Sequence, residues 1–511
     1  MARRGHLHEV ELVEEWPEPD GATSGGATVD GVPTGDEGPS AERGRRGRRL
    51  ALLVGAGLVA ALVVGGAVGQ VAVDRRERAT IAAVAAQPYG VDLLTRPPEP
   101  AWQVTTRHRV QLGDLRTADG LLVGVPSVAR GPVAVTAVDA ATGTEVWRVE
   151  LLDGSTRPGP GADTSAWADS GRCAPAGSRD GLVTCWVGDG VEVLTDEGST
   201  ALPPSVTRVV TLDARDGSVV TDVTGALGEQ VVAPSFAAVA DIVVVVAPTE
   251  GGADVVAVGP DGSERWRTTV AAPDDADERW FHLKAVGELV AVGSPSGLHL
   301  LDVQGRTVRS WEPGHGARHV VADVIGGQVH VVTSGDEGRA GTGDEDVRTT
   351  VVRPEAHVEV VGYPLLALDD GSVPGLLLTR VADRVTAWDA AGEELWSRDG
   401  RVTWNAFLVA GRLHLVGEGP LVTVDARTGE GLWESRAVAG TPVLDGRHVL
   451  GLARFPSAGG RPELVALDPA DGTEMWRSPL PDGTDDVTAS GHMLVAVDLT
   501  DRDDLTLTVL R

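Results

Sequence analysis

A short unit with an Asp, a Gly and a Trp at fixed spacing recurs along the chain and limits the folds that this sequence can adopt. Its clearest copy is Val465 to Arg477 (VALDPADGTEMWR), where apolar residues alternate into Asp468, Gly472 follows four residues later and Trp476 four residues after that. Alternating apolar residues are typical of a strand. Asp and Gly are typical of a tight turn, because the carboxylate accepts a backbone N–H and glycine adopts positive φ. Each unit is therefore predicted to be a β-hairpin with its Trp on the returning strand.

Six further copies precede this one. The complete copies contain Asp139, Gly143 and Trp147; Asp389, Gly392 and Trp396; and Asp425, Gly429 and Trp433. The degenerate copies contain Asp213 and Gly217 with Thr221 at the Trp position; Gly262 and Trp266 without the leading Asp; and Trp311 displaced by two residues. A lone hairpin cannot bury a Trp, so neighbouring units are expected to stack. The repeated Asp, Gly and Trp residues are therefore interpreted as structural.

The spacing of the copies predicts a propeller. The intervals between successive Trp-type positions are 74, 45, 45, 85, 37 and 43 residues. Repeats of about 40 to 50 residues with four strands each are propeller blades. The 85-residue interval is interpreted as two blades, one of them without the signature within 319–380, and the 74-residue interval as one blade with an insertion. We therefore predict an all-β propeller of about eight four-stranded blades, with seven or nine also compatible. Trp102 is expected to supply a strand that closes the ring against the last blade.

The repeat resembles the tryptophan-docking repeat of the pyrroloquinoline-quinone (PQQ) enzyme superfamily, in the form found in PQQ-like β-propeller proteins, over roughly residues 100–511. In architecture it is similar to the BamB-type propeller lipoprotein of the outer-membrane β-barrel assembly machine. Quinoprotein dehydrogenases of the superfamily hold the quinone between a Trp and a disulfide of adjacent cysteines, with calcium on carboxylates. This chain has no adjacent cysteines, so the resemblance implies the scaffold and not the cofactor site. One propeller hosts unrelated functions, so the resemblance does not fix an activity.

The first hundred residues predict a tail, a membrane anchor and a spacer. Residues 1–49 are rich in Gly, Pro, Ser and acidic side chains and end in an Arg cluster, and we expect them to be disordered. Residues 50–73 contain no charge and are long enough to cross a bilayer as a helix. The excess of Arg before this span predicts a cytoplasmic tail and an extracytoplasmic propeller. Residues 74–101 contain RPPEP at 96–100 and are interpreted as a stalk that leads to the propeller domain, residues 102–511.

Two cysteines lie in an insertion over 153–190, within the second blade. Two cysteines on a translocated domain most often pair, so Cys173 and Cys185 are predicted to form a disulfide. Trp167 and Trp186 flank them. Two interpretations stay open for this segment: an exposed, stapled binding loop, or an insertion that packs on its own blade.

The net charge and the absence of known catalytic motifs limit the functions that the sequence predicts. The formal net charge of −30 disfavours nucleic acid and anionic lipid surfaces as partners, and the preference for Arg over Lys is typical of a GC-rich bacterial genome. The sequence contains no nucleophile elbow, phosphate-binding loop or HExxH motif. No catalytic, cofactor-binding or metal-binding residue is therefore assigned.

The chain is predicted to be a single-pass membrane protein whose extracytoplasmic propeller is a non-enzymatic scaffold. Its partner would be a protein or another component of the cell envelope. Two alternatives remain: an extracytoplasmic ligand sensor, and a quinone- or metal-dependent oxidoreductase.

Overall fold

The computed structural model describes the propeller and the segment that leads into it. It describes residue 70 and residues 74–511 apart from 88, 107–111, 113–114, 127–130, 154–165, 168–170, 177–180, 196–197, 203, 228–234, 250, 272–280, 314–317, 326–327, 335–346, 400–404, 454–459 and 500–504. The described residues from 74 onward belong to one compact unit, Ala72–Arg511. The predicted tail and all of the predicted membrane span except Gln70 lie outside the described residues. Within the described part of the chain, no helix has the length and apolar character needed to cross a membrane.

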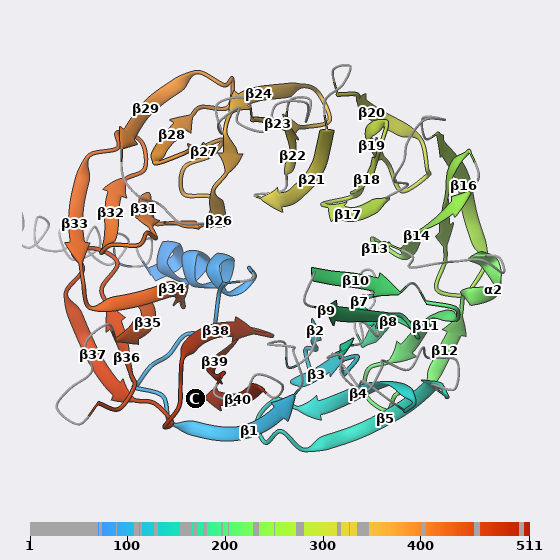
Figure 1. Cartoon of the computed structure of the whole chain (residues 1–511), viewed down its shortest axis with the longest axis horizontal. Coiled ribbons are helices and arrows are strands. Elements are labelled where there is room, and N and C mark those ends of the chain that lie inside the picture. Colours follow the sequence, from blue (N-terminus) through green and yellow to red (C-terminus); the bar gives the residue numbers. More distant parts are fainter. Residues whose placement is uncertain are drawn as a thin grey trace, which may run out of the picture. The chain divides into compact units, whose positions relative to one another are not determined.

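Nine sheets of four or five strands follow one another around a central axis in the described residues (Figure 1). Blades 1 to 5 are β2–β5 (Leu115–Arg116, Leu121–Gly124, Val133–Asp139, Glu145–Leu152); β7, β8, β11 and β12 (Gly171–Pro175, Leu182–Gly188, Thr207–Asp213, Val219–Asp222); β13–β16 (Phe236–Val239, Ile242–Thr249, Gly252–Val258, Glu264–Ala271); β17–β20 (His282–Val286, Leu289–Ser294, Gly297–Leu301, Thr307–Trp311); and β21–β24 (Arg318–Ile325, Gln328–Ser334, Arg348–Val352, His357–Val361). Blades 6 to 9 are β25 and β27–β29 (Tyr363–Pro364, Leu377–Val381, Arg384–Trp388, Glu394–Asp399); β26 and β30–β33 (Leu366–Asp369, Ala406–Val409, Arg412–Leu415, Leu421–Asp425, Gly431–Ser435); β34–β37 (Val438–Leu444, Val449–Ala453, Glu463–Leu467, Glu474–Pro479); and β38–β40 with β1 (Asp486–Ser490, Met493–Asp498, Leu505–Leu510, Pro100–Thr106).

Burial follows the position of a strand within its blade. The middle strand β15 reads GADVVAV and is buried almost throughout, because neighbouring blades cover both of its faces. The outer strand β16 alternates between exposed and partly buried residues, since one of its faces meets solvent. The predicted blade without a signature is confirmed as blade 5, whose four strands lie within 318–361.

The ring is closed by its two chain ends. Strand β1 pairs antiparallel with β40, and Trp102 lies opposite Val509, so the predicted closure through the Trp102 strand is confirmed. This closing sheet is also the reason why the expected count of eight is one too low. Strands β38–β40 carry no Asp–Gly–Trp unit, and the Trp strand of blade 9 comes from the far end of the sequence.

The two faces of the propeller differ. In each blade the first-to-second and third-to-fourth turns lie at one end of the antiparallel strands, and the second-to-third connection lies at the other. We call the first end the Asp-turn face, since it carries the Asp–Gly turns. On the opposite face, the insertions of blade 2 form a three-stranded sheet of β6 (Ala166–Trp167), β9 (Val191–Thr195) and β10 (Gly198–Leu202). One short helix, α2 (Thr224–Leu227), follows β12.

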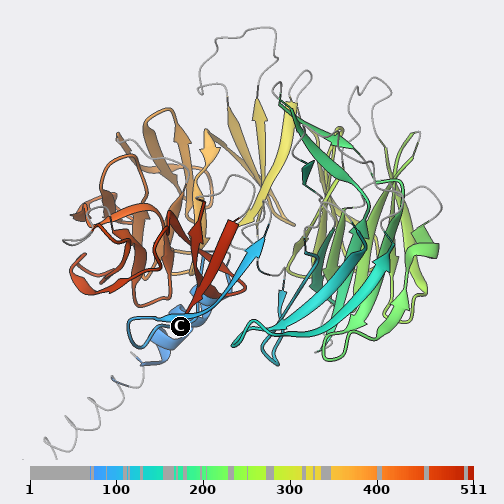
Figure 2. The ribbon, with the colours of Figure 1, turned by 60° about the horizontal axis from the view of Figure 1, so that its bottom comes forward.

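Residues 74–99, which we call the entry segment, pack on the Asp-turn face and do not form a free spacer. The segment begins with a helix over 74–85, drawn in blue inside the ring in Figure 1 and at the base of the blades in Figure 2. Val84 is fully buried against Leu368 and Phe407. Beyond the helix, Gly90 forms a parallel bridge with Leu444. The segment therefore joins blades 7 and 8 before the chain enters blade 9.

Candidate functional site

The Trp residues of the repeat connect each blade to the next. The ring N–H of the Trp donates to the carbonyl of the residue that follows the Asp position in the next unit. These bonds are Trp102 to Ala140 (3.1 Å), Trp147 to Ala214 (2.9 Å), Trp266 to Val303 (2.9 Å), Trp396 to Ala426 (3.0 Å) and Trp433 to Pro469 (3.2 Å). The same ring lies on the turn glycine of the next unit: a Cβ added to Gly429 would come within 2.7 Å of the Trp396 ring. Each glycine is therefore required by the contact as well as by its positive φ.

Two blades make the same hydrogen bond to the next blade without a Trp. In blade 2, the hydroxyl of Thr221 donates to the carbonyl of Pro260 at 2.6 Å. In blade 4 the equivalent residue is Arg309, whose partner Leu300 lies next to the same strand bulge that marks the Trp position in other blades. Its guanidinium donates to the carbonyl of Glu355 at 3.0 Å. Trp311, two residues further, is half-buried against the core cluster that blades 4 and 5 share.

In blade 5 the equivalent residue is Val358. A Cβ added to Gly392 would lie 2.6 Å from a methyl group of Val358. An aliphatic side chain can replace the Trp contact with the turn glycine, but it has no group to donate to the next turn. Blade 5 therefore gave no repeat signal in the sequence.

The Asp residues hold the turns. One carboxylate oxygen of Asp139 accepts the backbone N–H groups of Ala141 and Thr142, at 2.8 and 2.9 Å. These backbone bonds lower the pKa of Asp139 below its usual value. At Asp425 burial raises the pKa, but the backbone N–H groups of Thr428 and Arg427 outweigh it and the pKa is lowered. The repeat carboxylates thus act as acceptors within their own turns, each in a different blade, so they do not converge on one site.

The two cysteines lie in the blade and not in a loop. Cys173 on β7 and Cys185 on β8 are opposite each other in the strand register and form the predicted disulfide, with an S–S distance of 2.04 Å. Both are buried, as is Trp186. Two interpretations were open for the segment 153–190: an exposed binding loop, or packing on its own blade. For the two cysteines, packing on the blade is correct. The strands β7 and β8 are the first two strands of blade 2.

A buried carboxylate fixes the base of the three-stranded sheet on the opposite face. Asp189 is fully buried at the end of β8. Its oxygens accept the backbone N–H and the hydroxyl of Ser205, both at 2.6 Å, and the backbone N–H of Val206 at 2.9 Å. Asp189 therefore joins the two ends of the excursion that carries β9 and β10, so the excursion leaves the blade at a defined place. No sequence motif marked this residue.

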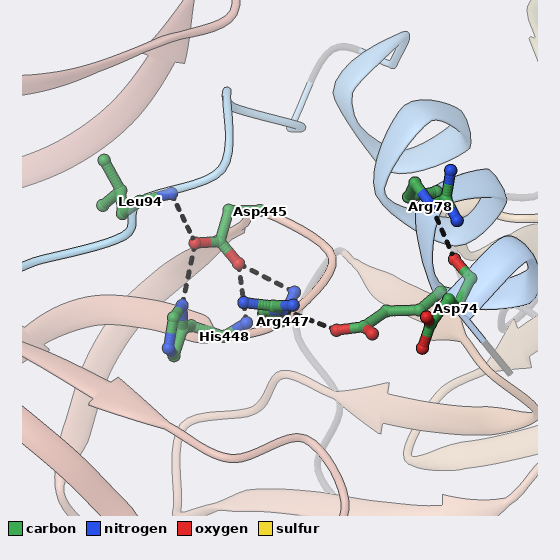
Figure 3. Close-up of polar contacts among 7 residues, drawn as sticks. Asp74, Arg78, Leu94, Asp445, Arg447 and His448 are labelled. Carbon is green, nitrogen blue, oxygen red and sulfur yellow. Dashed lines mark hydrogen bonds and ion pairs between the residues drawn. The ribbon is translucent and has the colours of Figure 1, made fainter. Parts of the chain in front are cut away.

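A second buried carboxylate holds the entry segment. Asp445, in the first turn of blade 8, has no exposed surface. It accepts the backbone N–H of Leu94 at 3.1 Å and the ring N–H of His448 at 2.8 Å (Figure 3). Its other oxygen accepts the backbone N–H groups of Arg447 and His448, at 2.8 and 2.6 Å. The neighbouring Arg447 forms an ion pair with Glu77 of the helix at 2.5 Å.

Further bonds fasten the segment along its length. The Gln87 amide bonds the backbone of Asp369 in both directions, donating to its carbonyl at 2.5 Å and accepting its N–H at 2.8 Å. Tyr89 packs edge-on against Phe407, with 5.4 Å between ring centroids. The backbone N–H of Asp92 donates to the carbonyl of His492 at 2.8 Å. Polar and apolar contacts to blades 7, 8 and 9 thus fix the position of the entry segment.

His414 is a strongly perturbed titratable group. It is fully buried in β31, bonds the Thr423 hydroxyl at 2.8 Å and lies 5.6 Å from the Trp433 ring. Burial, with a contribution from Arg412, lowers its pKa to about 3. Enclosed inside blade 7, it is interpreted as a neutral packing residue. Among the described residues, no group of three or more His, Cys, Asp or Glu side chains has the arrangement of a metal site.

Comparisons with solved structures found similarity to proteins of several kinds. BamB from Moraxella catarrhalis is 14% identical, with 81% of this chain and 99% of that chain covered and a TM-score of 0.38. A eukaryotic initiation factor is 8% identical, with coverage of 77% and 91% and a TM-score of 0.44. A europium-containing methanol dehydrogenase is 10% identical, with coverage of 77% and 80% and a TM-score of 0.26. No curated protein matches the chain.

A family model identifies the repeat. The PQQ-type model described as outer membrane protein assembly factor BamB matches residues 131–345 and 417–510, more than half of the chain. The matched ranges include the docking Trp residues of blades 1, 3, 7 and 8. The part between them holds the last two strands of blade 5, β23 and β24, and all of blade 6. The chain belongs to the PQQ-type, BamB-like propeller family.

Proposed function

We propose that this protein is a membrane-anchored scaffold whose propeller binds a protein partner outside the cytoplasm. Residues 50–73 are the proposed anchor, with residues 1–49 in the cytoplasm. Membership of the BamB-like family supports protein binding as the general role. The proposed role is non-enzymatic, since the titratable residues of the repeat act as turn acceptors and His414 is enclosed in its blade.

The observation that carries the proposal is the docking of the entry segment on the Asp-turn face. Residue 74 directly follows the proposed anchor, and residues 74–99 contact blades 7, 8 and 9. The chain that directly follows the proposed anchor is therefore held on this face. The opposite face is left for the partner. It carries the three-stranded sheet β6, β9 and β10, which Asp189 holds in place.

Site-specific photo-crosslinking in intact cells tests the choice of face. A photoreactive residue at Val206 or Arg461 reports on the opposite face, and one at Ala141 or Ala470 reports on the Asp-turn face; all four positions are exposed. We expect a crosslinked protein from the first pair alone. Equal crosslinking from both pairs, or crosslinking from the Asp-turn pair alone, contradicts the choice of face.

The anchor and the absence of enzymatic activity are tested separately. Alkaline carbonate should leave the full chain in the membrane fraction, and external protease should digest the propeller but spare the tail. Release by carbonate would exclude the anchor. Saturable uptake of PQQ in the presence of calcium, followed by absorption, would favour an oxidoreductase over a scaffold.

A further inference from the structure

A pocket on the Asp-turn face is lined by residues from the two ends of the propeller. Its volume is about 300 Å³. Its walls come from residues 92–96 of the entry segment, Arg116 of β2, residues 492–494 of blade 9, and Leu510 and Arg511. The Asp92 backbone bond to His492 places the entry segment beside the turn between β38 and β39. The pocket therefore lies where the entry segment meets blades 1 and 9.

The pocket is basic at its rim and apolar at its floor. Arg96, Arg116 and Arg511 line it, with His492. Met493, Leu494 and Leu510 are buried beneath them. The whole chain has a formal net charge of −30, so a pocket lined by three arginines is a basic site on an acidic protein. Such a combination suits an anionic group attached to an apolar body.

Two carboxylates offset part of this charge. Asp92 forms an ion pair with Arg116. The second carboxylate is Asp139, whose pKa is lowered in part by the positive charge of Arg511. Arg96 has no ion pair among the described residues and is exposed. The backbone N–H groups of Leu93, Thr95 and Arg96 also bind no protein acceptor in the described structure. Free N–H groups beside an unpaired guanidinium are the donors that a phosphate requires.

We propose that this pocket binds the phosphate of a membrane phospholipid, with the glycerol end of the lipid on the apolar floor. The choice of a lipid rests on the proposed anchor, because the pocket lies on the same face as the entry segment, which directly follows that anchor in the sequence. The net charge of the whole chain does not oppose a single headgroup here. Charges further away than about 8 Å are largely screened at physiological ionic strength, so the nearby arginines decide the local potential.

Calorimetric titration of the full chain in a neutral detergent tests the site. The probes are a soluble short-chain phosphatidylglycerol, the matching phosphatidylcholine and inorganic phosphate. We expect phosphatidylglycerol to bind most tightly, and Arg96→Gln to weaken its binding about tenfold, the effect of losing one charge-assisted bond. The matched control is Arg461→Gln, an exposed arginine on the opposite face, and its binding should equal that of the wild type. Equal melting temperatures of the three proteins would show that the fold is unchanged.

Each other result overturns the proposal. Binding of inorganic phosphate as tightly as phosphatidylglycerol would exclude the lipid. A lack of binding, or equal weakening by both substitutions, would exclude the pocket. Because the titration is done in detergent, its outcome does not depend on the anchor, which carbonate extraction tests independently.

Discussion

At the scale of single residues, one contact explains why Asp, Gly and Trp recur together. The Trp N–H reaches the backbone of the next turn, the ring covers the turn glycine, and the Asp carboxylate holds that turn. The three residues thus serve one interblade contact, although the Trp belongs to a different blade from the Asp and Gly that it meets. Thr221 and Arg309 show that the bond to the next carbonyl persists when the ring is lost.

Replacing Trp396 by Ala should strongly destabilise the propeller. Trp396 is 8% exposed and donates to the carbonyl of Ala426. A buried Trp-to-Ala change costs about 3–5 kcal/mol of unfolding free energy, measurable by urea unfolding. Trp396→Phe keeps most of the ring and should cost about 1 kcal/mol for the lost hydrogen bond. Trp476 is only half-buried, so replacing it by Ala would test the interblade contact less sharply. An unchanged stability of Trp396→Ala would contradict the role of Trp396 in holding blade 6 to blade 7.

Gly429→Ala should be costly where Gly419→Ala is not. A Cβ at Gly429 would lie 2.7 Å from the Trp396 ring, and the residue has a φ of +71°. The strain and the steric overlap together should cost about 2 kcal/mol or more. Gly419 has nothing within 4 Å of an added Cβ and no positive φ. Similar melting temperatures for the two variants would argue against this explanation.

His414 should make the folded state sensitive to acid. Its pKa in the folded protein is about 3, below the usual value of 6.5. The unfolded chain therefore binds a proton that the folded chain excludes, and stability falls as pH drops from about 6.5 towards 3. The slope from this group approaches about 1.4 kcal/mol per pH unit. Unfolding curves of His414→Leu should lack this slope, whatever the variant's stability at neutral pH; an identical slope would contradict the assignment.

At the scale of elements, the blades share one plan but differ in how they are completed. Blade 9 takes its outer strand from the start of the propeller. Blade 7 gains a parallel fifth strand, β26, from the connection inside blade 6. Blade 2 carries the extra sheet and a disulfide between its first two strands. Strands β1 and β26 adjoin the entry segment, and the extra sheet of blade 2 lies on the opposite face, where we propose that the partner binds.

Removing the disulfide should destabilise blade 2. Cys173 and Cys185 are separated by twelve residues, and in the chain-entropy model closing such a loop contributes on the order of 3 kcal/mol. The double variant Cys173→Ala, Cys185→Ala should therefore melt at a lower temperature. A reductant should lower the melting temperature of the wild type and leave that of the variant unchanged. Insensitivity of both proteins to the reductant would show that the bond adds no stability.

At the scale of the whole described unit, the entry segment connects three blades at the point where the ring closes. Its apolar residues belong to core clusters shared with blades 7, 8 and 9, and its hydrogen bonds reach the same three blades. A propeller is closed by one pairing of its chain ends, here β1 with β40. The entry segment adds a second connection across the same region. A fragment that begins within or after it would leave buried residues such as Phe407 exposed.

Val84→Asp should release the entry segment, whereas Ala82→Asp should not. Val84 is fully buried and Ala82 is exposed on the same helix. Fully burying a Val contributes about 1.5–3 kcal/mol, and an unpaired carboxylate there adds a desolvation cost. We expect faster proteolysis within residues 74–99 and a lower melting temperature for Val84→Asp alone. Equal behaviour of the two variants would indicate that the segment is not held by this contact.

The sequence by itself determined the local geometry of the propeller. Alternation, turn chemistry and the Asp–Gly–Trp spacing depend on residues close together in the chain, and they were sufficient for the hairpins, blade 5, the disulfide pair and the closing strand of Trp102. The tertiary structure alone decided the rest. The ninth blade is assembled from both ends of the chain, Arg309 holds a Trp position through strand register, and Asp189 and Asp445 gain their roles through buried contacts with distant backbone. The docking of the entry segment was likewise decided by the tertiary structure alone. Its hydrogen-bond partners lie some 280 to 400 residues away in the sequence, and no local sequence pattern encodes a contact over that distance.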